Sequence, residues 1–372
     1  MDKHLHIICL TVPYPVDYGG VFDLFYKLPA LQQQGIKIHL HCFDYGRGQQ
    51  EELEKYCESV NYYQRSPYSL FNQVPYIVAS RKNEALFSNL LRDEHPILME
   101  GIHCTALLND PRFSNRKCFV RLHNVEFEYY RDLSLVTGSF FKKLYLKRES
   151  RLLKKYENSI ANKAAFFSVT GKDAATYRKE FNCKNIVHIP LFLPDWNVDA
   201  KEGVGSYCLY QGDLSVAANS KMAEWLIRNV FSSTQISLKI AGKKPSSYLH
   251  QLVDKFENVL LVADPSEEQM QQLISNAHIN IIPSTSNTGI KLKLLNALFN
   301  GRHCLVNTAT VEGTGFESLC HIANTSEHMK DLVSQLYHQP FRADELQERR
   351  VILQKAFNNE KNAKELMKLI WY

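Results

Sequence analysis

Several features that would assign this chain to a membrane, secreted or nucleic-acid-binding class are missing from its sequence. No run approaches the roughly 18 apolar residues of a membrane-spanning helix, and the mean hydropathy is −0.29. The nine cysteines include no CxxC pair, which argues against a disulfide framework or a four-cysteine zinc site and fits a reducing compartment. The 44 basic and 39 acidic residues leave a net charge of only +5, too small to indicate nucleic acid. We therefore expect a soluble, cytoplasmic, globular protein without a nucleic-acid partner.

The common catalytic signatures are missing as well. There is no DxD to hold a divalent ion against a diphosphate and no HExxH zinc motif. Neither a GxxxxGKS/T phosphate loop nor a GxSxG nucleophile turn occurs. The absence of GxGxxG disfavours a nicotinamide or flavin dinucleotide. We accordingly expect no metal and no organic cofactor, so that a helix dipole and lysine would have to stabilise any diphosphate leaving group.

What is present is an alternation of short apolar runs with amphipathic stretches, which is typical of βα units around a parallel sheet. The 372 residues exceed one ordinary domain, and prolines and glycines around residues 189–205 indicate a linker. We predict an α/β protein of two Rossmann-like domains with a cleft between them. The predicted strands are residues 6–12, 37–43, 96–99, 118–122 and 165–169 before the linker, and 207–210, 237–240, 259–262, 279–282 and 304–306 after it.

Helices are predicted where apolar residues recur at helical spacing. Residues 21–34 carry Phe22, Phe25 and Leu28 at this spacing and stop before Gly35. After about residue 344 the chain reads as helical to its end. Further helices are predicted over residues 216–229, 267–275 and 289–300.

Ligands of open α/β sheets bind at the carboxyl ends of strands, so the residues after each apolar run are the first candidates for a site. Gly19 and Gly20 precede a helix, where backbone N–H groups and the helix end favour a phosphate or sugar; a plain tight turn is the alternative. His123 can contact a sugar hydroxyl or position a leaving group, or it is a structural histidine with Asn124 capping the next helix. Glu100 would point toward the same cleft, either to contact an acceptor hydroxyl or to satisfy a loop.

The sharpest signal in the second half follows the strand over residues 279–282. We predict a helix whose amino end lies around Thr288 and in which Gly289, Lys293 and Asn296 share one face. A helix amino end with a lysine one turn in is a sensible pyrophosphate site, and the asparagine could bond a ribose or sugar hydroxyl. The alternative is an ordinary solvated lysine face.

Two further strand ends belong to the same domain. Gly212 and Asp213 close its first strand, and the glycine lets a ligand come near the backbone. Lys243 closes its second strand and adds a cation at the same sheet edge. Each signal is weak alone, but together with the helix they indicate one binding edge.

Five motifs occur along the chain: YPxxxGG at residues 14–20, R-x-H-N-V-E at 121–126, Gly212-Asp213-Leu214 with Asn219, GIKLKLL at 289–295 with Gly301, and Val311-Glu312-Gly313. In this order they resemble the GT-B glycosyltransferases, specifically glycosyltransferase family 4, over nearly the whole chain. The resemblance implies retaining, metal-independent transfer of a hexose, with mannose as a candidate, from a UDP- or GDP-linked sugar. The acceptor would be a glycan or lipid-linked molecule in cell-surface polysaccharide synthesis.

The resemblance also implies a domain plan and roles for single residues. Residues 1–198, completed by a C-terminal helix over about 358–372 that crosses back, would bind the acceptor, and residues 199–357 would bind the donor. His123 would contact the donor sugar near the reacting carbon, and Lys293 would neutralise the departing diphosphate. The implied donor-binding residues are Gly19, Gly20, Gly212, Asp213, Lys243, Thr288, Gly289, Ile290, Lys291 and Asn296, and the acceptor-side candidates are Tyr14, Asp17, Tyr18, Glu100 and Asn124.

The chain departs from the family at one place. The family's signature helix usually carries two glutamates eight positions apart, the first on the donor sugar and the second on the ribose; here those positions hold Thr288 and Asn296. Asparagine can still bond a ribose hydroxyl, without the charge-assisted strength of a carboxylate. A second interpretation therefore stays open, in which a degenerate GT-B protein binds nucleotide or glycan without catalysis.

Residues 141–160 predict one long amphipathic helix. Basic clusters on such helices can bind anionic lipid at about 1 kcal/mol per charge, which would hold the protein peripherally at the inner face of the membrane. The alternative is a helix whose apolar arc packs into the domain while its basic residues are solvated. The basic arc comprises Lys143, Lys147, Arg148, Arg151, Lys154 and Lys155.

Overall fold

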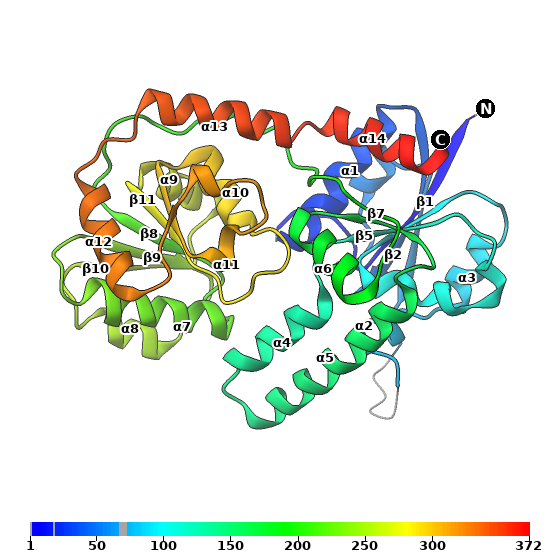
Figure 1. Cartoon of the computed structure of the whole chain (residues 1–372), viewed down its shortest axis with the longest axis horizontal. Helices are drawn as coiled ribbons and strands as arrows, with labels where there is room; N and C mark the ends of the chain where they lie inside the picture. The colour runs from blue at the N-terminus through cyan, green and yellow to red at the C-terminus, as the bar shows by residue number, and fades with distance from the viewer. Residues whose placement is uncertain (1, 18, 67–72) are drawn as a thin grey trace. The chain divides into compact units, whose positions relative to one another are not determined.

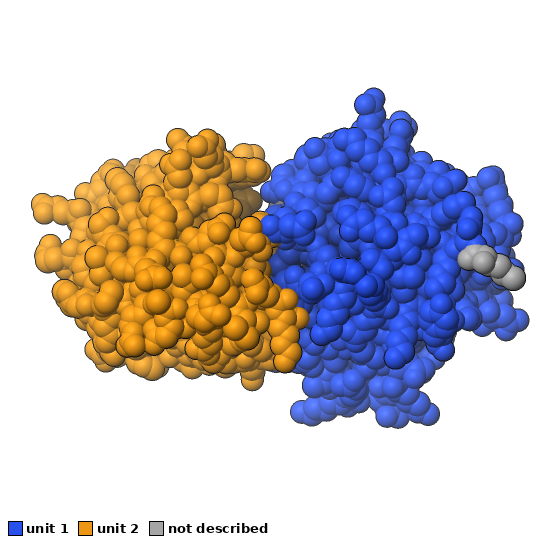
Figure 2. All heavy atoms as spheres, turned by 90° about the horizontal axis from the view of Figure 1, so that it is seen from above, with its two compact units in different colours: residues 1–131, 144–195, 356–372 blue, residues 132–143, 196–355 orange. Residues whose placement is uncertain are grey.

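The structure is a computed structural model that describes residues 2–17, 19–66 and 73–372. It divides into two compact units, which Figure 2 colours separately. Each unit contains one parallel β-sheet flanked by helices (Figure 1), so the predicted α/β class with two parallel sheets is confirmed. Unit 1 comprises Met1–Arg131, Leu144–Asp195 and Ala356–Tyr372, and unit 2 comprises Asp132–Lys143 and Trp196–Lys355.

The sheet of unit 1 has seven parallel strands in the order β3-β2-β1-β4-β5-β6-β7. Strands buried on both faces read as continuous apolar runs, and for this reason the sequence predicted five of the seven. It missed β3, which is polar and half-buried, and β7, which has only three residues. The strands are β1 (Lys3–Cys9), β2 (Ile36–Asp44), β3 (Ser59–Gln64), β4 (Ile97–Glu100), β5 (Cys118–Leu122), β6 (Ala165–Ser168) and β7 (Ile186–His188).

Helices cover both faces of this sheet. Because successive strand residues point to opposite faces, Leu5 and Ile7 of β1 pack with the helices α1 and α14, while Ile8 belongs to the apolar cluster on the other face. The helices are α1 (Phe22–Gln32), α2 (Tyr76–Ala79), α3 (Glu84–Leu90), α4 (Glu126–Val136), α5 (Phe140–Ile160), α6 (Gly171–Phe181) and α14 (Asn359–Trp371), with short 3-10 turns at Gly19–Val21, Glu51–Lys55, Ile102–Asn109 and Pro111–Phe113.

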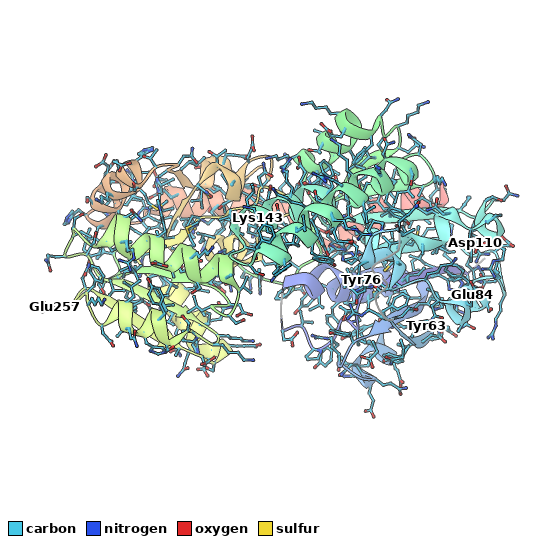
Figure 3. All side chains as sticks on the ribbon, turned by 90° about the horizontal axis from the view of Figure 1, so that it is seen from below. Tyr63, Tyr76, Glu84, Asp110, Lys143 and Glu257 are labelled. Carbon is cyan, nitrogen blue, oxygen red and sulfur yellow. The ribbon has the colours of Figure 1, made fainter. Side chains whose placement is uncertain are left out.

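The long helix α5 is anchored in unit 1 by two carboxylates. Glu149 accepts a 2.7 Å hydrogen bond from the backbone N–H of Tyr76, which is labelled in Figure 3. Glu157 accepts bonds of 3.1 and 3.0 Å from the backbone N–H groups of Glu126 and Phe127. The amino end of α4 is therefore capped by Glu157 rather than by Asn124, contrary to the structural alternative considered for the residues around His123. Within the described residues, no helix is both long enough and apolar enough to cross a bilayer.

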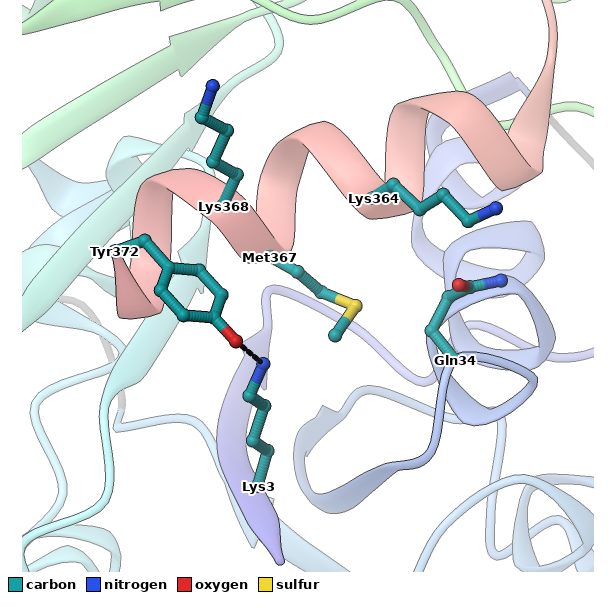
Figure 4. A pocket seen from close by; sticks show the side chains of 6 residues that line it. All are labelled: Lys3, Gln34, Lys364, Met367, Lys368 and Tyr372. Carbon is teal, nitrogen blue, oxygen red and sulfur yellow. Dashed lines mark hydrogen bonds between the residues drawn. The ribbon is translucent and has the colours of Figure 1, made fainter. Parts of the chain in front are cut away.

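The C-terminal helix α14 returns to unit 1 and completes its core. Ala363, Leu366 and Ile370 are buried on the α1 side of the sheet. A cavity of about 430 Å³ lies beside this helix at the amino end of β1, where Lys3 Nζ donates a 2.9 Å hydrogen bond to the hydroxyl of Tyr372 (Figure 4). This cavity is at the opposite end of β1 from the strand ends that predict ligand binding.

The sheet of unit 2 has six parallel strands in the order β10-β9-β8-β11-β12-β13. The five predicted strands of this half match within two residues at each end, and the sequence missed only β13, which has two residues. The strands are β8 (Cys208–Gln211), β9 (Leu238–Gly242), β10 (Val259–Ala263), β11 (Ile279–Ile282), β12 (His303–Val306) and β13 (His321–Ile322).

Contacts with α13 and β11 fix the carboxyl end of α10. Arg349 on α13 is buried and donates to the carbonyl groups of Gly301 and Arg302, over 2.5 and 2.7 Å, at the end of α10. Gly301 itself lies so close to Asn280 that a Cβ there would come within 2.3 Å of the Asn280 amide nitrogen. The helices are α7 (Ala217–Leu226, continued as a π-turn over Ile227–Phe231), α8 (Ser247–Val253), α9 (Glu267–Asn276), α10 (Leu292–Asn300), α11 (Thr308–Val311), α12 (Ser326–Tyr337) and α13 (Ala343–Ala356), with a 3-10 turn at Glu317–Leu319.

The buried carboxyl of Glu126 gives unit 1 a pH-dependent stability. Burial raises the pKa of Glu126 to about 7, against the hydrogen bond from Asn124 that lowers it. A carboxyl whose pKa is raised by folding stabilises the protein below its unfolded pKa, and this contribution is lost as pH rises through the folded value. The free energy of unfolding of the wild type should therefore fall between pH 5 and 8, and one such group accounts for at most about 1.4 kcal/mol per pH unit. We expect the Glu126→Gln variant to lose less free energy of unfolding over the same range.

Urea unfolding of both proteins at several pH values measures this effect. The variant Glu51→Gln, at an exposed position of the same unit, is the control and should keep the wild-type slope. Parallel pH profiles for the wild type and Glu126→Gln would contradict the assignment.

Candidate active site

In each sheet the strand order reverses at its first strand. β1 lies between β2 and β4, and β8 lies between β9 and β11. Ligands of open α/β sheets bind outside the carboxyl ends of the strands at such a reversal. We therefore define two candidate surfaces: the unit 1 edge, after β1, β4 and β5, and the unit 2 edge, after β8, β9 and β11.

A buried ionic network lies at the unit 1 edge. The ammonium of Lys27 on α1 donates to Glu100 Oε1 over 2.5 Å and to Asp23 Oδ2 over 3.0 Å. Asp23 also accepts two bonds of 2.9 Å from the guanidinium of Arg121 on β5. These four side chains are at most 3 % exposed, and burial of charge at this depth is tolerated only with such pairing. The network therefore fixes α1, β4 and β5 relative to one another.

His123 is the member of this group that reaches solvent. Its Nε2 lies 2.9 Å from Glu100 Oε2, and its side chain is 18 % exposed, whereas Glu100 is 1 % exposed. Burial alone would raise the pKa of Glu100, but Lys27 and His123 outweigh it and lower the pKa. The ionised carboxylate can only accept, so the proton of a neutral His123 belongs on Nε2 and Nδ1 keeps its lone pair. His123 can thus accept a hydrogen bond from a hydroxyl, with Glu100 behind it as a positioning residue.

The side chains of Asp23, Glu100 and His123 also approach one another as metal ligands would, with one ligand atom of each within 4.8 Å of the others. However, Lys27 already bonds both carboxylates, and Arg121 bonds Asp23 a second time. Their negative charge is therefore compensated by two side-chain cations. The cluster does not fit a metal.

The loop after β1 supplies the remaining predicted residues of the unit 1 edge. The turn Gly19–Val21 carries both predicted glycines and leads directly into α1. Asp17 pairs with Arg47 over 2.8 Å, which ties this loop to the loop after β2. Tyr14 is half-buried at the base of the loop. Tyr18 lies outside the described residues.

At the unit 2 edge, α10 begins later than the sequence predicted. The helix starts at Leu292, with Lys291 as its N-cap in an extended conformation. Gly289 has φ +62°, a left-handed conformation that interrupts helical geometry. The predicted helix start around Thr288 was therefore wrong, and Gly289 shares no helix face with Lys293. The correction places Lys293 at the second helical position, closer to the amino end than expected.

Lys293 is a half-buried cation without an anionic partner among the described residues. Its Nζ lies 5.3 Å from the ring centroid of Tyr210 on β8, and within the described part of the chain it makes no hydrogen bond or ion pair. Burial, followed by repulsion from Lys291, lowers the pKa of Lys293 to about 8. The group therefore still carries its charge at pH 7. A cation beside the positive end of a helix favours binding of an anion.

The loop before α10 is already organised by its own contacts. Lys291 Nζ donates to the carbonyl of Thr288 over 2.5 Å, and Thr288 is 1 % exposed. Ile290 is half-buried between them. Asn296 accepts a 2.8 Å hydrogen bond from the amide of Asn300. Its own amide N–H groups are therefore the groups that it can offer to a ligand.

The ends of β8 and β9 complete the unit 2 edge. A Cβ at Gly242 would lie 1.8 Å from the carbonyl oxygen of Gly212, so only glycine allows these two strand ends to approach as they do. The carboxylate of Asp213 accepts bonds of 2.9 and 2.6 Å from the backbone and hydroxyl of Ser215. Lys243 is exposed at the end of β9. Because β9, β8 and β11 are neighbours, the predicted residues of this unit share one edge.

Sequence reasoning missed three members of the unit 1 network. Asp23 and Lys27 are four residues apart on a helix whose neighbouring positions are buried and apolar. Charged residues at this spacing within a buried stripe are the signal that could have found them. Arg121 was noticed only as part of a motif, and no pattern in the sequence pairs it with α1.

Comparison with known proteins supplies a family for most of unit 2 and a fold for the whole chain. The family described as Glycosyl transferases group 1 matches residues 205–339. A curated relative, an uncharacterized 44.6 kDa protein in the cps region of Klebsiella pneumoniae, is 26% identical over 334 residues, covering 83% of this chain and 84% of the relative. TarM of S. aureus gives a TM-score of 0.71 at 12% identity, covering 100% of this chain and 99% of TarM. A UDP-forming α,α-trehalose-phosphate synthase from Burkholderia xenovorans, in complex with glucose-6-phosphate, gives 0.62 at 12% identity over 100% of both chains.

The two doubly wound units define a GT-B protein, the class expected from the sequence motifs. The family model described as Glycosyl transferases group 1 matches residues 205–339, and the likeness in fold extends over the whole chain. Both findings support a transferase.

The buried network makes a prediction about stability. We expect Lys27→Met to lower the free energy of unfolding by about 3–5 kcal/mol, because it leaves Glu100 and Asp23 as buried carboxylates with one cation fewer. Denaturant unfolding of wild type and variant measures the change. Lys55→Met is the matched control, since Lys55 pairs with Glu52 at an exposed site and such pairs contribute little. Equal losses in the two variants would refute the structural role of the network.

Proposed function

We propose that this chain is a retaining glycosyltransferase that moves a hexose, with mannose as a candidate, from a UDP- or GDP-linked sugar to a glycan or lipid-linked acceptor. Unit 2 binds the nucleotide sugar and unit 1 binds the acceptor. The observation that carries the proposal is Lys293, a half-buried cation at the amino end of α10 that has no counter-ion among the described residues. A nucleoside diphosphate supplies the anion that this position lacks.

The chemistry of transfer fits a fixed cation. When the bond between the anomeric carbon and the diphosphate breaks, the leaving phosphate gains negative charge. Preorganised positive groups at a developing charge are usually the largest catalytic contribution. Lys293 and the first N–H groups of α10 supply such groups, and Lys243 adds an exposed cation on the same edge. In this proposal the protein needs no metal for leaving-group stabilisation. The UDP-forming activity named for the Burkholderia xenovorans synthase supports a uridine nucleotide.

His123 is the proposed contact to the transferred sugar. Its Nδ1 can accept a hydrogen bond from a sugar hydroxyl, while Glu100 and Lys27 hold the ring in one orientation. The loop of Tyr14 and Asp17 and the turn Gly19–Val21 adjoin the same edge and are proposed to contact the acceptor and the donor phosphate, respectively.

The cell-surface role rests on the relative from the cps region of Klebsiella pneumoniae, which supports a place in polysaccharide synthesis. A lipid-linked acceptor would bring the protein to a membrane surface. The first turns of α5 have a suitable composition, because Phe140, Phe141 and Leu144 are 74%, 81% and 60% exposed. Exposed basic residues, among them Lys147 and Arg151, follow on the same helix. We therefore propose that α5 contacts anionic lipid through these turns.

The alternative function is binding of a nucleotide or glycan without transfer. The observation that favours it is the pair of substituted positions: Thr288 is buried, and Asn296 already bonds Asn300. Neither residue offers a carboxylate to the donor.

Lys293 provides the decisive test of the proposed function. We expect Lys293→Ala to reduce transfer by roughly 10²–10³-fold or more, as loss of a preorganised group at the developing charge does, while the protein remains folded. Because the pKa of Lys293 is about 8, UDP or GDP should bind wild type more weakly as pH rises from 7 to 9. Lys293→Arg keeps its charge over this range and should bind with little pH dependence.

The measurements are thermal shifts with UDP, GDP, ADP and their sugar conjugates, followed by product analysis with the donor that stabilises most. Lys239→Ala is the matched control, because Lys239 also lies over a tyrosine ring, 3.9 Å from that of Tyr207, but within β9 rather than at the sheet edge. Ligand-induced shifts without product would establish the binding-only alternative. Unchanged transfer by Lys293→Ala would remove the proposal.

A vesicle experiment tests the lipid surface. We expect wild type to co-sediment with vesicles containing anionic lipid, and the double variant Phe140→Ser and Phe141→Ser to bind several-fold less, because the aromatic side chains supply buried apolar area. Leu260→Ser, at a position that is 52% exposed in unit 2, is the control. Binding that persists in the double variant, or that is absent for neutral and anionic vesicles alike, would exclude this role of α5.

A further inference from the structure

Five histidines gather on one face of the unit 1 sheet, away from the carboxyl ends of its strands. His4 and His6 alternate along β1, and His39 and His41 alternate along β2. The register pairs His6 with His39, so all four point to the same face. His95 lies just before β4 and stacks over His4, with ring centroids 4.6 Å apart. Apolar packing on this face begins only with the next residues, Ile8 and Phe43.

The inner pair of the cluster is saturated by hydrogen bonds. His6 Nδ1 lies 2.9 Å from His41 Nε2, and His6 Nε2 lies 3.0 Å from the carboxylate of Asp93. His41 Nδ1 lies 2.9 Å from the hydroxyl of Tyr63, which is labelled in Figure 3. Both nitrogens of each ring are thus in use. His6 and His41 are 4% and 2% exposed and belong to the structure of the sheet.

The outer three histidines, His4, His39 and His95, are not all saturated by hydrogen bonds in this way. His4 Nδ1 lies 3.0 Å from His39 Nε2, and the two rings are within 10° of coplanar, so two imidazole nitrogens face each other directly. The ring of His95 makes no hydrogen bond within the described residues. One nitrogen from each of the three rings lies within 4.8 Å of the other two. All three side chains are partly exposed, which leaves an entry path.

We propose that His4, His39 and His95 bind a divalent metal ion of the Zn²⁺ type. Neutral imidazoles are preferred ligands of zinc and of the neighbouring first-row metals, and a set without carboxylates does not suit Mg²⁺ or Ca²⁺. Three histidines leave a fourth tetrahedral position for water. Two ligands of a tetrahedral zinc are about 3.3 Å apart, so the 3.0 Å contact between His4 and His39 needs to open only slightly. His95 reaches the same ion by rotation of its side chain.

The surroundings hold these ligands in place. The hydroxyl of Ser59 on β3 lies 3.0 Å from His39 Nδ1, the arrangement in which a ligating histidine donates its second N–H to a neighbour. The backbone of His95 is fixed from two sides: its N–H donates to Asp93 over 2.9 Å, and its carbonyl accepts a 2.8 Å bond from Arg116. A bound ion would thus join β1, β2 and the segment before β4. Its expected effect is on the stability of unit 1, independently of sugar transfer.

A second histidine cluster in unit 2 is less suited to a metal. His303, His321 and Glu345 also approach within ligand distance of one another. The central ring of His303 is already used at both nitrogens, since Nε2 lies 3.0 Å from the carbonyl of Gln339 and Nδ1 lies 3.3 Å from His321 Nε2. This cluster therefore serves as the internal control.

The test is titration of the metal-free, full-length protein with ZnCl₂ by calorimetry, with MgCl₂ as the comparison salt. We expect one saturable Zn²⁺ site per chain, no Mg²⁺ binding, and a rise in the unfolding temperature with Zn²⁺. His39→Gln and His95→Gln should weaken Zn²⁺ binding at least tenfold, and Ser59→Ala by about tenfold, as loss of an outer partner of a ligand does. His321→Gln should bind as wild type does.

The variant His95→Gln also controls for unfolding, because the ring of His95 makes no hydrogen bond within the described residues that the substitution could remove. Its circular dichroism should match wild type before Zn²⁺ is added. Co²⁺ in place of Zn²⁺ should give the visible absorption of a tetrahedral site in wild type and in His321→Gln, but not in His95→Gln. Absence of saturable Zn²⁺ binding, equal affinity in His95→Gln, or loss of binding in His321→Gln would each overturn the proposal.

Discussion

The mutual pairing of four buried charges is the constraint on which the unit 1 edge depends. Neither Asp23 nor Glu100 can sit at its depth without Lys27, and Arg121 needs Asp23 in the same way. Because these residues come from a helix and two strands, their pairing admits one arrangement of α1 against the sheet. Arg121 also donates to the carbonyls of Ile189 and Pro190, over 2.6 and 2.9 Å, which draws the chain leaving β7 into the same arrangement. Because Glu100 is held by this network, its contact with His123 also fixes the orientation of the His123 ring.

The unit 2 edge uses charge in the opposite way. Lys293 is half-buried and makes no hydrogen bond or ion pair within the described residues, and desolvation together with repulsion from Lys291 lowers its pKa. Arg349 and the close contact at Gly301 fix the far end of α10, so the helix cannot simply move to expose the lysine. The buried charges at the unit 1 edge are thus paired with one another, whereas the charge of Lys293 at the unit 2 edge is available to a ligand. This difference agrees with the roles that we propose for the two edges, a positioning surface in unit 1 and an anion-binding surface in unit 2.

The sequence predicted those elements whose burial produces a regular apolar pattern. It did not predict features that depend on contacts between residues far apart in the chain. Ten of the strands read directly from apolar runs, whereas β3, β7 and β13 are too polar or too short to stand out. The start of α10 was misplaced because a left-handed Gly289 is invisible to helical periodicity. At the sites, glycines and lysines at strand ends were found from their position after apolar runs. The partners of Arg121 and the meeting of His4 with His95 join residues distant in the chain, and no local pattern encodes them.

The return of α14 to unit 1 has a consequence for how the molecule is made. Most of unit 2 is one continuous segment, Trp196–Lys355, whereas unit 1 needs residues from both ends of the chain. During synthesis, Leu366 and Ile370 cannot cover the apolar surface over Leu5 and Ile7 until α14 has been translated. Unit 2 can therefore fold on the ribosome before unit 1 is complete, and a chain truncated before α14 would leave these apolar residues of unit 1 exposed to aggregation while unit 2 is folded.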